Sequence, residues 1–251
     1  MEIKMNKLKA IVTVAALTLS TSVMAFTSDN ERIDAYLKVL DSTNMEKKEK
    51  MLNNLQWSGL SDARLYDDIE MRLKSQYLNP NLYGQLNLVA YQVRALGFSG
   101  NEKYRSTITE ISNNAASPKL KRHARKALVS LKKYVEWNKL INNSHLNVDG
   151  ESVEVATYMK MLTIDDVLLQ RIAARAIFHE KQHDNDLLDL AAVKLKELYL
   201  QPGLSGAWQD TASWLCKAIG QSGDSQYINL LSIVASDTPH QKIKRYASKY
   251  I

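Results

Sequence analysis

Apolar residues recur at three- and four-residue intervals from about residue 30 to the end of the chain, with few interruptions. This spacing places them on one face of an α-helix, in which 3.6 residues make one turn. The clearest apolar stripe runs from Leu82 to Leu96, and Gly97 follows it, where we expect the helix to end. Pro118 suits the first turn of a later helix. The pattern therefore predicts an all-α fold.

The same pattern occurs twice. The segment 95–100 (Ala-Leu-Gly-Phe-Ser-Gly) returns as 218–223 (Ala-Ile-Gly-Gln-Ser-Gly), and Tyr104 returns as Tyr227. Corresponding positions lie roughly 122 residues apart, which indicates a tandem duplication of one block. A polar segment rich in turn formers separates the copies. We expect a first block at 26–141, a linker at 142–151 and a second block at 152–251.

Each copy divides into three helical hairpins of roughly forty residues. A hairpin of this kind cannot bury its apolar face alone, so it stacks on its neighbours. The helix start before the second hairpin is expected at Ser61 or Asp62, which can cap it. In the second copy, we expect helices near 152–163, 165–180, 184–200, 206–219, 224–236 and 239–251.

The residues that end these helices carry a family resemblance. The segment 93–97 (Val-Arg-Ala-Leu-Gly), followed by the basic, alanine-rich 121–128, resembles the HEAT-like (armadillo-type) helical repeat, and 217–220 (Lys-Ala-Ile-Gly) has the same form. The resemblance covers nearly all of the chain after residue 25. It implies a right-handed α-solenoid of about six hairpins in two duplicated halves, of an exported bacterial type. Such solenoids are usually binding scaffolds, although a fold does not fix a function.

The first 25 residues have the pattern of a cleaved signal peptide. Three lysines precede an apolar run at 10–19, and 23–25 (Val-Met-Ala) supplies small residues for cleavage before Phe26. The alternative is an uncleaved membrane anchor. No later stretch is long and apolar enough to cross a bilayer, so we expect no transmembrane segment in the mature chain and a periplasmic or secreted location.

Composition narrows the classes of function. The chain has 33 Lys and Arg against 27 Asp and Glu, a formal net charge of +6, which is too small for a dedicated nucleic-acid binder. The single cysteine, Cys216, cannot form an internal disulfide. It aligns with the apolar position Val93, so we expect it to be a core residue.

One motif suggests an enzyme. His179-Glu180-Lys181-Gln182-His183 has the spacing of a zinc hydrolase, in which two histidines one helical turn apart bind the metal and the glutamate activates water. The repeat alignment, however, places the motif across the turn between two helices, with Asp184 as the cap of the second. We interpret it as a turn, and keep the zinc hydrolase as the alternative function.

Basic residues recur in both copies and form the main candidate site. In each copy they follow the spacing i, i+3, i+7 with further cations beside them, opposite an apolar face. The candidates are Lys119, Lys121, Arg122, Arg125 and Lys126 in the first copy and Lys242, Lys244, Arg245 and Lys249 in the second. These rows would contact an acidic protein surface or anionic lipid headgroups; alternatively, they only keep these helices soluble.

The sequence therefore predicts a protein of the cell envelope that captures a macromolecular partner and has no chemistry of its own, without a metal or cofactor. A purely structural role in an envelope complex is a third possibility.

Overall fold

The computed structural model describes residues 26–146 and 148–251, and within them every regular element is a helix. The prediction of an all-α fold is confirmed. The predicted signal peptide lies outside the described residues. The first copy contains α1 (Asp29–Asp41), α2 (Met45–Asn54), η1 (Leu55–Trp57), α3 (Ala63–Lys74), α4 (Leu86–Phe98), η2 (Glu102–Tyr104), α5 (Arg105–Asn114) and α6 (Pro118–Asn142). The second contains α7 (Val153–Thr163), α8 (Val167–Glu180), α9 (Asn185–Leu198), α10 (Gly206–Gly220), α11 (Ser225–Asp237) and α12 (Gln241–Ala247).

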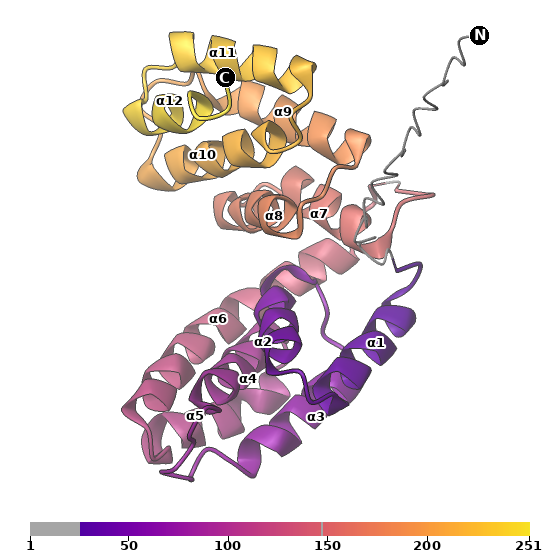
Figure 1. Ribbon diagram of the computed structural model, residues 1–251, viewed down its shortest axis with the longest axis vertical. Coiled ribbons are helices and arrows are strands. Elements are labelled where there is room, and N and C mark those ends of the chain that lie inside the picture. The colour runs from indigo at the N-terminus through magenta and orange to yellow at the C-terminus, as the bar shows by residue number, and fades with distance from the viewer. Residues whose placement is uncertain (1–25, 147) are drawn as a thin grey trace, which may run out of the picture.

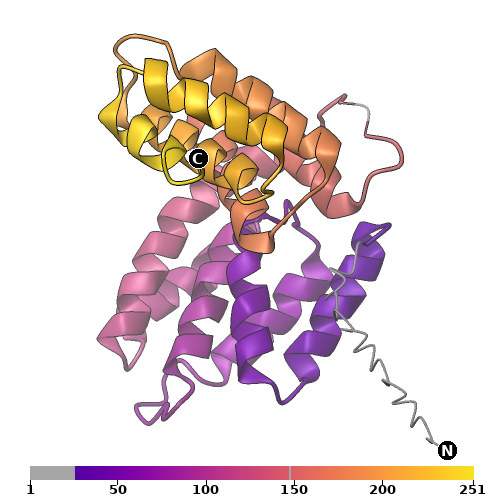
Figure 2. The same ribbon diagram turned by 45° about the horizontal axis from the view of Figure 1, so that its top comes forward.

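Consecutive helices pair as hairpins, and the hairpins stack (Figure 1). In the first half α4 packs between α2 and α6, and in the second half α10 packs between α8 and α12. The even-numbered helices thus form one layer in each half, and the odd-numbered helices cover it on the other side. Figure 2 shows the two halves stacked on one another, with α1 to α6 below and α9 to α12 above.

The helices begin where the sequence places caps. The Asp62 carboxylate accepts a hydrogen bond from the Arg64 N–H at 2.8 Å at the start of α3, and Asp184 accepts one from the Leu187 N–H at 2.9 Å at the start of α9. Pro118 occupies the first turn of α6. The Asp62 and Asp184 side chains accept from N–H groups that have no partner within the helix. The predicted starts of all three helices are confirmed.

The duplication is visible in individual contacts. Tyr104 Oη donates to Asp67 Oδ1 at 2.8 Å, and the corresponding Tyr227 Oη donates to Asp189 Oδ1 at the same distance. Each bond joins the start of one hairpin to the first helix of the hairpin before it. Both copies therefore hold neighbouring hairpins together in the same way.

Gly97 does not end α4, contrary to the expectation from the sequence. The helix continues through Phe98, and a Cβ on Gly97 would lie 2.7 Å from the carbonyl oxygen of Ala127 on α6. The missing side chain lets the two helices approach closely. The turn instead falls on Gly100, whose φ of +61° is a conformation that favours glycine.

The two halves meet through corresponding positions of the two copies. The rings of Trp57 and His179 stack at 5.9 Å with an interplanar angle of 4°. Arg32 Nη1 on α1 lies 3.9 Å from Glu154 Oε1 on α7. Each of these contacts joins a residue to its own counterpart in the other copy. The first hairpins of the two halves thus face one another.

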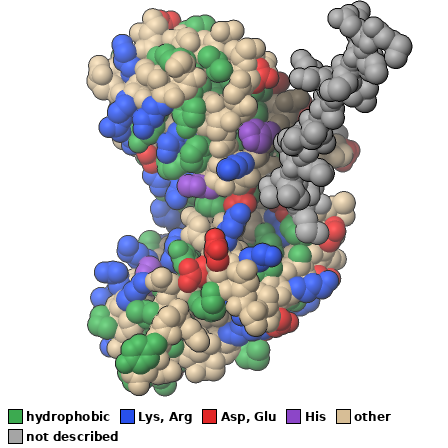
Figure 3. Space-filling model, in the orientation of Figure 1, with side chains coloured by type: hydrophobic (Ala, Val, Ile, Leu, Met, Phe, Trp, Pro, Cys, Tyr) green, Lys and Arg blue, Asp and Glu red, His purple; other side chains and the backbone are tan. Residues whose placement is uncertain are grey.

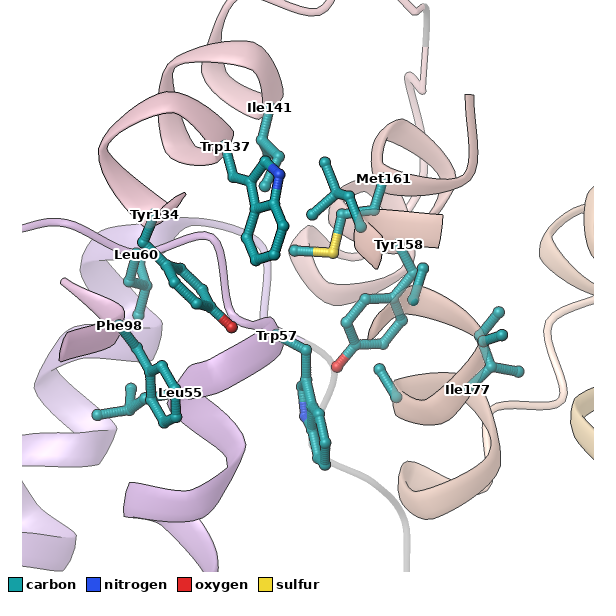
Figure 4. Close-up of a cluster of buried hydrophobic side chains, with 14 of the residues drawn as sticks. Leu55, Trp57, Leu60, Phe98, Tyr134, Trp137, Ile141, Tyr158, Met161 and Ile177 are labelled. Atoms are coloured by element: carbon teal, nitrogen blue, oxygen red, sulfur yellow. The ribbon is translucent and has the colours of Figure 1, made fainter. Parts of the chain in front are cut away.

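A cluster of buried aromatic and aliphatic side chains fills the rest of this junction (Figure 4). Tyr134 and Trp137 extend from α6 toward the second half, and Tyr158 and Met161 extend from α7 toward the first. The Trp137 indole N–H also donates to Asp166 Oδ2 at 2.9 Å, and Asp166 caps α8. Because large side chains from both halves are buried there, the halves form one core across the junction.

Candidate binding surface and junction cavity

The His-Glu-x-x-His motif does not lie on one helix. Helix α8 ends at Glu180, and Lys181 adopts a left-handed conformation with φ 52° and ψ 47°. His183 lies in the turn beyond, directly before the capping Asp184. The two imidazoles therefore do not take the one-turn spacing that the zinc hydrolase requires. Among the residues that the structure describes, no three His, Cys, Asp or Glu side chains come together in a way that could hold a metal ion.

Glu180, the acidic residue of the motif, faces a cavity of about 310 Å³ at the junction of the two halves. Asn54 Nδ2 on α2 donates to Glu180 Oε1 at 2.6 Å. Burial raises the pKa of this carboxyl above its usual range. Corresponding tyrosines, Tyr36 and Tyr158, form part of the wall. We call this space the junction cavity.

Arg32 and Glu154 are two charged residues in the wall of the junction cavity. The Arg32 side chain is only 2% exposed, and its Nη2 donates to Asp29 Oδ1 and to the Ser58 carbonyl oxygen, both at 2.7 Å. Its Nε and both carboxylate oxygens of Glu154 are buried without a hydrogen-bond partner. Unpaired buried polar atoms are costly, so these two groups need an explanation.

Three of the predicted basic residues of the first copy lie around the His123 side chain. Burial lowers the pKa of this imidazole, and four neighbouring cations lower it further: Arg94, Lys119, Arg122 and Lys126. A small cavity of about 150 Å³ lies between α4 and α6, lined by Arg94, Lys119, His123 and Tyr91 among others. Three of the predicted residues, together with Arg94, therefore form one group.

The second copy builds the same group around Tyr246, the counterpart of His123. Three cations lie over its ring: Lys217 Nζ at 5.2 Å, Arg245 Cζ at 4.9 Å and Lys249 Nζ at 5.1 Å from the centroid. Lys242 forms an ion pair with Asp210 at 2.8 Å. In the corresponding place of the first copy, Lys119 donates a hydrogen bond to the uncharged Asn87.

Trp214 connects the second group to the junction. Lys217 Nζ lies 3.6 Å from the Trp214 ring centroid, and Arg175 Cζ lies 5.4 Å from it. The His179 ring lies 5.5 Å from Trp214 and stacks on Trp57. Burial lowers the pKa of His179, and the charges of Arg175 and Lys217 lower it further. An unbroken series of contacts between cations and aromatic rings thus runs from Tyr246 on α12, through Lys217, Trp214 and His179, to Trp57 in the first half.

We call these residues together the basic-aromatic surface: Arg94, Lys119, Arg122, His123 and Lys126 in the first copy, and Arg175, Trp214, Lys217, Lys242, Arg245, Tyr246 and Lys249 in the second. Sequence reasoning missed Arg94, Arg175 and Lys217. Arg94 and Lys217 occupy corresponding positions in the two copies, and that correspondence could have identified them.

The remaining predicted cations lie apart from this surface. Lys121 is half-buried, and Arg125 and Lys244 are exposed. None of the three is among the charges that act on His123 or the cations that lie over Tyr246. The residues at the i, i+3, i+7 spacing are therefore the ones that act on His123 or take part in the second group, and the flanking residues are not among them.

Few acidic residues accompany these cations. In the five described helices α4, α6, α8, α10 and α12, the acidic residues are Glu136, Glu180 and Asp210. Arg122, Lys126, Arg245 and Lys249 make no ion pair within the part of the chain that the structure describes. Figure 3 shows Lys and Arg side chains on both sides of the hollow between the two halves.

Comparison with known proteins adds little to this geometry. No protein-family model matches the chain, and no curated protein matches it. One solved structure that it resembles is human deoxyhypusine hydroxylase in complex with glycerol, with 10% sequence identity, a TM-score of 0.35 and coverage of 87% of this chain and 82% of that chain. At this level of similarity, the match assigns neither activity nor substrate to the chain.

The comparison nevertheless corrects one expectation. The sequence-based conclusion that this protein has no chemistry of its own rested on its helical-repeat form and on the lack of a recognisable catalytic motif, and the matched structure is that of a hydroxylase, an enzyme. The inference from helical repeats to the absence of catalysis was therefore wrong.

Within the described residues, no helix is both long and apolar enough to span a membrane.

Proposed function

We propose that the protein binds an acidic segment of a partner protein along the basic-aromatic surface. The observation that carries this proposal is the repetition of one arrangement in both halves. Arg94 and three cations surround His123, and Lys217 and two further cations surround Tyr246. The first group lies on α4 and α6 of the first half, and the second lies on α10, α12 and the residue range just after α12 in the second half.

Electrostatics favours an anionic partner. Cations that crowd together without counter-ions repel one another, and a bound carboxylate relieves that repulsion. Aromatic rings add contact area beside the charges, and Trp214 already holds Lys217 by a cation–π contact at 3.6 Å. Aromatic and arginine side chains are also the residue types that contribute most to binding at protein interfaces.

A polypeptide fits the arrangement better than a single small anion. The two groups belong to different halves, and the Trp57–His179–Trp214 contacts join them. A flexible chain with several carboxylates can contact both groups at once, which raises affinity over contact with either alone. Anionic lipid headgroups present the same charge on a flat membrane surface and are the competing source of anions.

The test compares charge reversals at neighbouring positions. The variant Arg122→Glu/Arg245→Glu changes both groups of the surface, and Lys121→Glu/Lys244→Glu makes the same change in net charge at residues outside it. The probe is a fluorescein-labelled oligoglutamate peptide, followed by fluorescence anisotropy and by quenching of tryptophan emission. We expect the first variant to weaken binding by at least tenfold, with about twofold for the control, since each lost charge-assisted contact contributes roughly 1.5–3 kcal/mol.

Equal loss in both variants would show that net charge alone attracts the probe, and would contradict a defined surface. Vesicles of phosphatidylglycerol test the other source of anions. Tighter binding to these vesicles than to the peptide, lost in the first variant only, would replace the acidic polypeptide by a membrane surface. The predicted export, and with it an envelope location of the partner, is tested separately by fractionation of cells that express the full chain.

A further inference from the structure

The first described residue, Phe26, is held in place by the second half of the molecule. Its carbonyl oxygen accepts a hydrogen bond from the Val153 N–H at 3.0 Å, at the start of α7. Its ring meets the ring of Tyr36 edge to face, at 6.2 Å and 87°. The next residue is also fixed, because the Thr27 N–H donates to Glu31 Oε2 at 3.0 Å. The backbone nitrogen of Phe26 therefore has a defined position in the wall of the junction cavity.

Glu154, in the same wall, lacks a close partner. Both of its carboxylate oxygens are buried without a hydrogen bond, and the nearest cation, Arg32 Nη1, is 3.9 Å away. Burial raises the pKa of this carboxyl, while Arg32 and the backbone N–H groups of Glu154 itself and of Phe26 act in the opposite direction. Phe26 and Glu154 line the same cavity, and the hydrogen bond from Val153, the residue before Glu154, holds the Phe26 backbone beside the carboxylate. A buried carboxylate in this condition is costly unless a cation pairs with it.

We propose that removal of residues 1–25 creates this cation: the α-ammonium group of Phe26 pairs with Glu154 at the junction of the two halves. A signal peptidase would hydrolyse the Ala25–Phe26 peptide bond, adding the hydroxyl group of water to the Ala25 carbonyl carbon and hydrogen to the Phe26 nitrogen. The new amine has an ordinary pKa of about 7.7–8.0, so it takes up a proton from solvent at neutral pH. The proposal depends on the predicted cleavage site and is independent of the proposed binding function.

Cleavage then changes the junction as well as the length of the chain. Before cleavage, the Phe26 nitrogen is part of an uncharged peptide group. After cleavage, it carries a positive charge beside a buried negative one, and the pair joins α1 to α7 across the two halves. The ionisable groups that face Glu154 are Arg32, Asp29 and Tyr36 on α1, Tyr158 on α7 and Glu180 on α8. The ion pair would therefore stabilise the folded state of the cleaved chain and not that of the uncleaved chain.

The experiment uses two versions of the full mature chain. One begins at Phe26, released from a fusion by a protease that leaves no extra residue, and the other carries Gly-Ser before Phe26, which moves the charged terminus away. Each is made with Glu154, with Glu154→Gln and with the control Glu151→Gln. We expect the chain that begins at Phe26 to melt about 5 °C or more above the extended chain, since loss of one partner of a buried pair is strongly destabilising.

In Glu154→Gln, this difference in Tm should disappear, and in Glu151→Gln it should remain. A direct readout is the pKa of the ¹⁵N-labelled Phe26 amino group by NMR, which a nearby carboxylate raises and which should fall in Glu154→Gln. A difference in Tm that survives Glu154→Gln, or an amino pKa that does not change, would overturn the proposal. So would a mass for the exported chain that places the cleavage at another bond.

Discussion

Two histidines beside cations, His123 in the basic-aromatic surface and His179 next to it, show how the pKa of a single residue depends on its electrostatic surroundings. His123 is half-buried and His179 is exposed, each lies beside several cations, and each has a pKa below its ordinary value. The physical causes are the same: burial first, then the neighbouring Lys and Arg side chains. The pKa of each imidazole therefore responds to the positive charges nearby as well as to burial.

Removal of one neighbouring cation should raise the pKa of the adjacent histidine only. Lys217→Gln should raise the pKa of His179 and leave His123 unchanged, while Arg94→Gln should raise the pKa of His123 and leave His179 unchanged. Titration of the imidazole Cε1–H signals by NMR measures both values in one sample. A bound oligoglutamate peptide should raise both, because added negative charge favours the protonated form. The two variants serve as controls for one another, and equal changes at both histidines would contradict local control.

The same shift affects the stability of the protein at low pH. A histidine whose pKa is lower in the folded state than in the unfolded state binds more protons when unfolded. Stability should therefore decrease as the pH falls below about 6.5, the ordinary pKa of histidine. His179→Gln should reduce this loss in urea unfolding between pH 7 and pH 5. An unchanged pH dependence in that variant would show that His179 does not contribute.

At the scale of helices, the close packing of α4 against α6 depends on the absence of a side chain at Gly97. A Cβ there would meet backbone atoms of Ala127 at 2.7 Å and 2.8 Å, and backbone cannot move aside as a flexible side chain can. Gly206, at the start of α10, has no atom within 4 Å of the same position. The two glycines therefore allow a matched comparison.

Gly97→Ala should destabilise the protein by about 1–3 kcal/mol, because α4 and α6 must separate to admit the methyl group. Gly206→Ala should be neutral or slightly stabilising, since alanine restricts the unfolded chain more than glycine does. Urea unfolding followed by circular dichroism measures both. Similar effects of the two substitutions would show that close approach of α4 and α6 is not the reason for Gly97.

These elements show what the sequence could predict. The starts of α3, α6 and α9 followed from Asp62, Pro118 and Asp184, because capping is a local property of a few residues. The role of Gly97 did not follow, since glycine after an apolar stripe also suits a helix end. The distinction depends on how near α6 comes, which is a tertiary property. The candidate site was predicted in part for the same reason: spacing along α6 and α12 is local, but the approach of Arg94 and Arg175 is not.

At the scale of the whole molecule, the junction is the feature that the pattern could not predict. Periodicity shows which side of a helix is buried, but not what buries it. Trp57, His179 and Tyr158 each looked like an ordinary member of one copy. The structure places them against residues of the other copy and leaves a cavity between. The two halves should therefore unfold together.

Trp57→Ala should destabilise the whole protein by about 3–5 kcal/mol, as expected for a buried aromatic side chain, and keep a single unfolding transition. Trp208, which is half-buried within the second half, is the matched control, and Trp208→Ala should cost less. Calorimetry measures the number of transitions. Two transitions, with only the first lowered by Trp57→Ala, would show that the halves are independent units.

Contacts between corresponding residues have a consequence for the origin of the chain. In a symmetric homodimer, residues near the twofold axis meet their own counterparts in the second subunit, as Trp57 meets His179 and Arg32 meets Glu154 here. A protein with only one copy of the block could form this contact only by pairing with a second molecule, to an extent set by its concentration. Joined in one polypeptide, the two surfaces are always at high effective concentration. Within one polypeptide the two positions need not be identical, so an arginine in one copy can face a glutamate in the other, which a symmetric homodimer could not arrange.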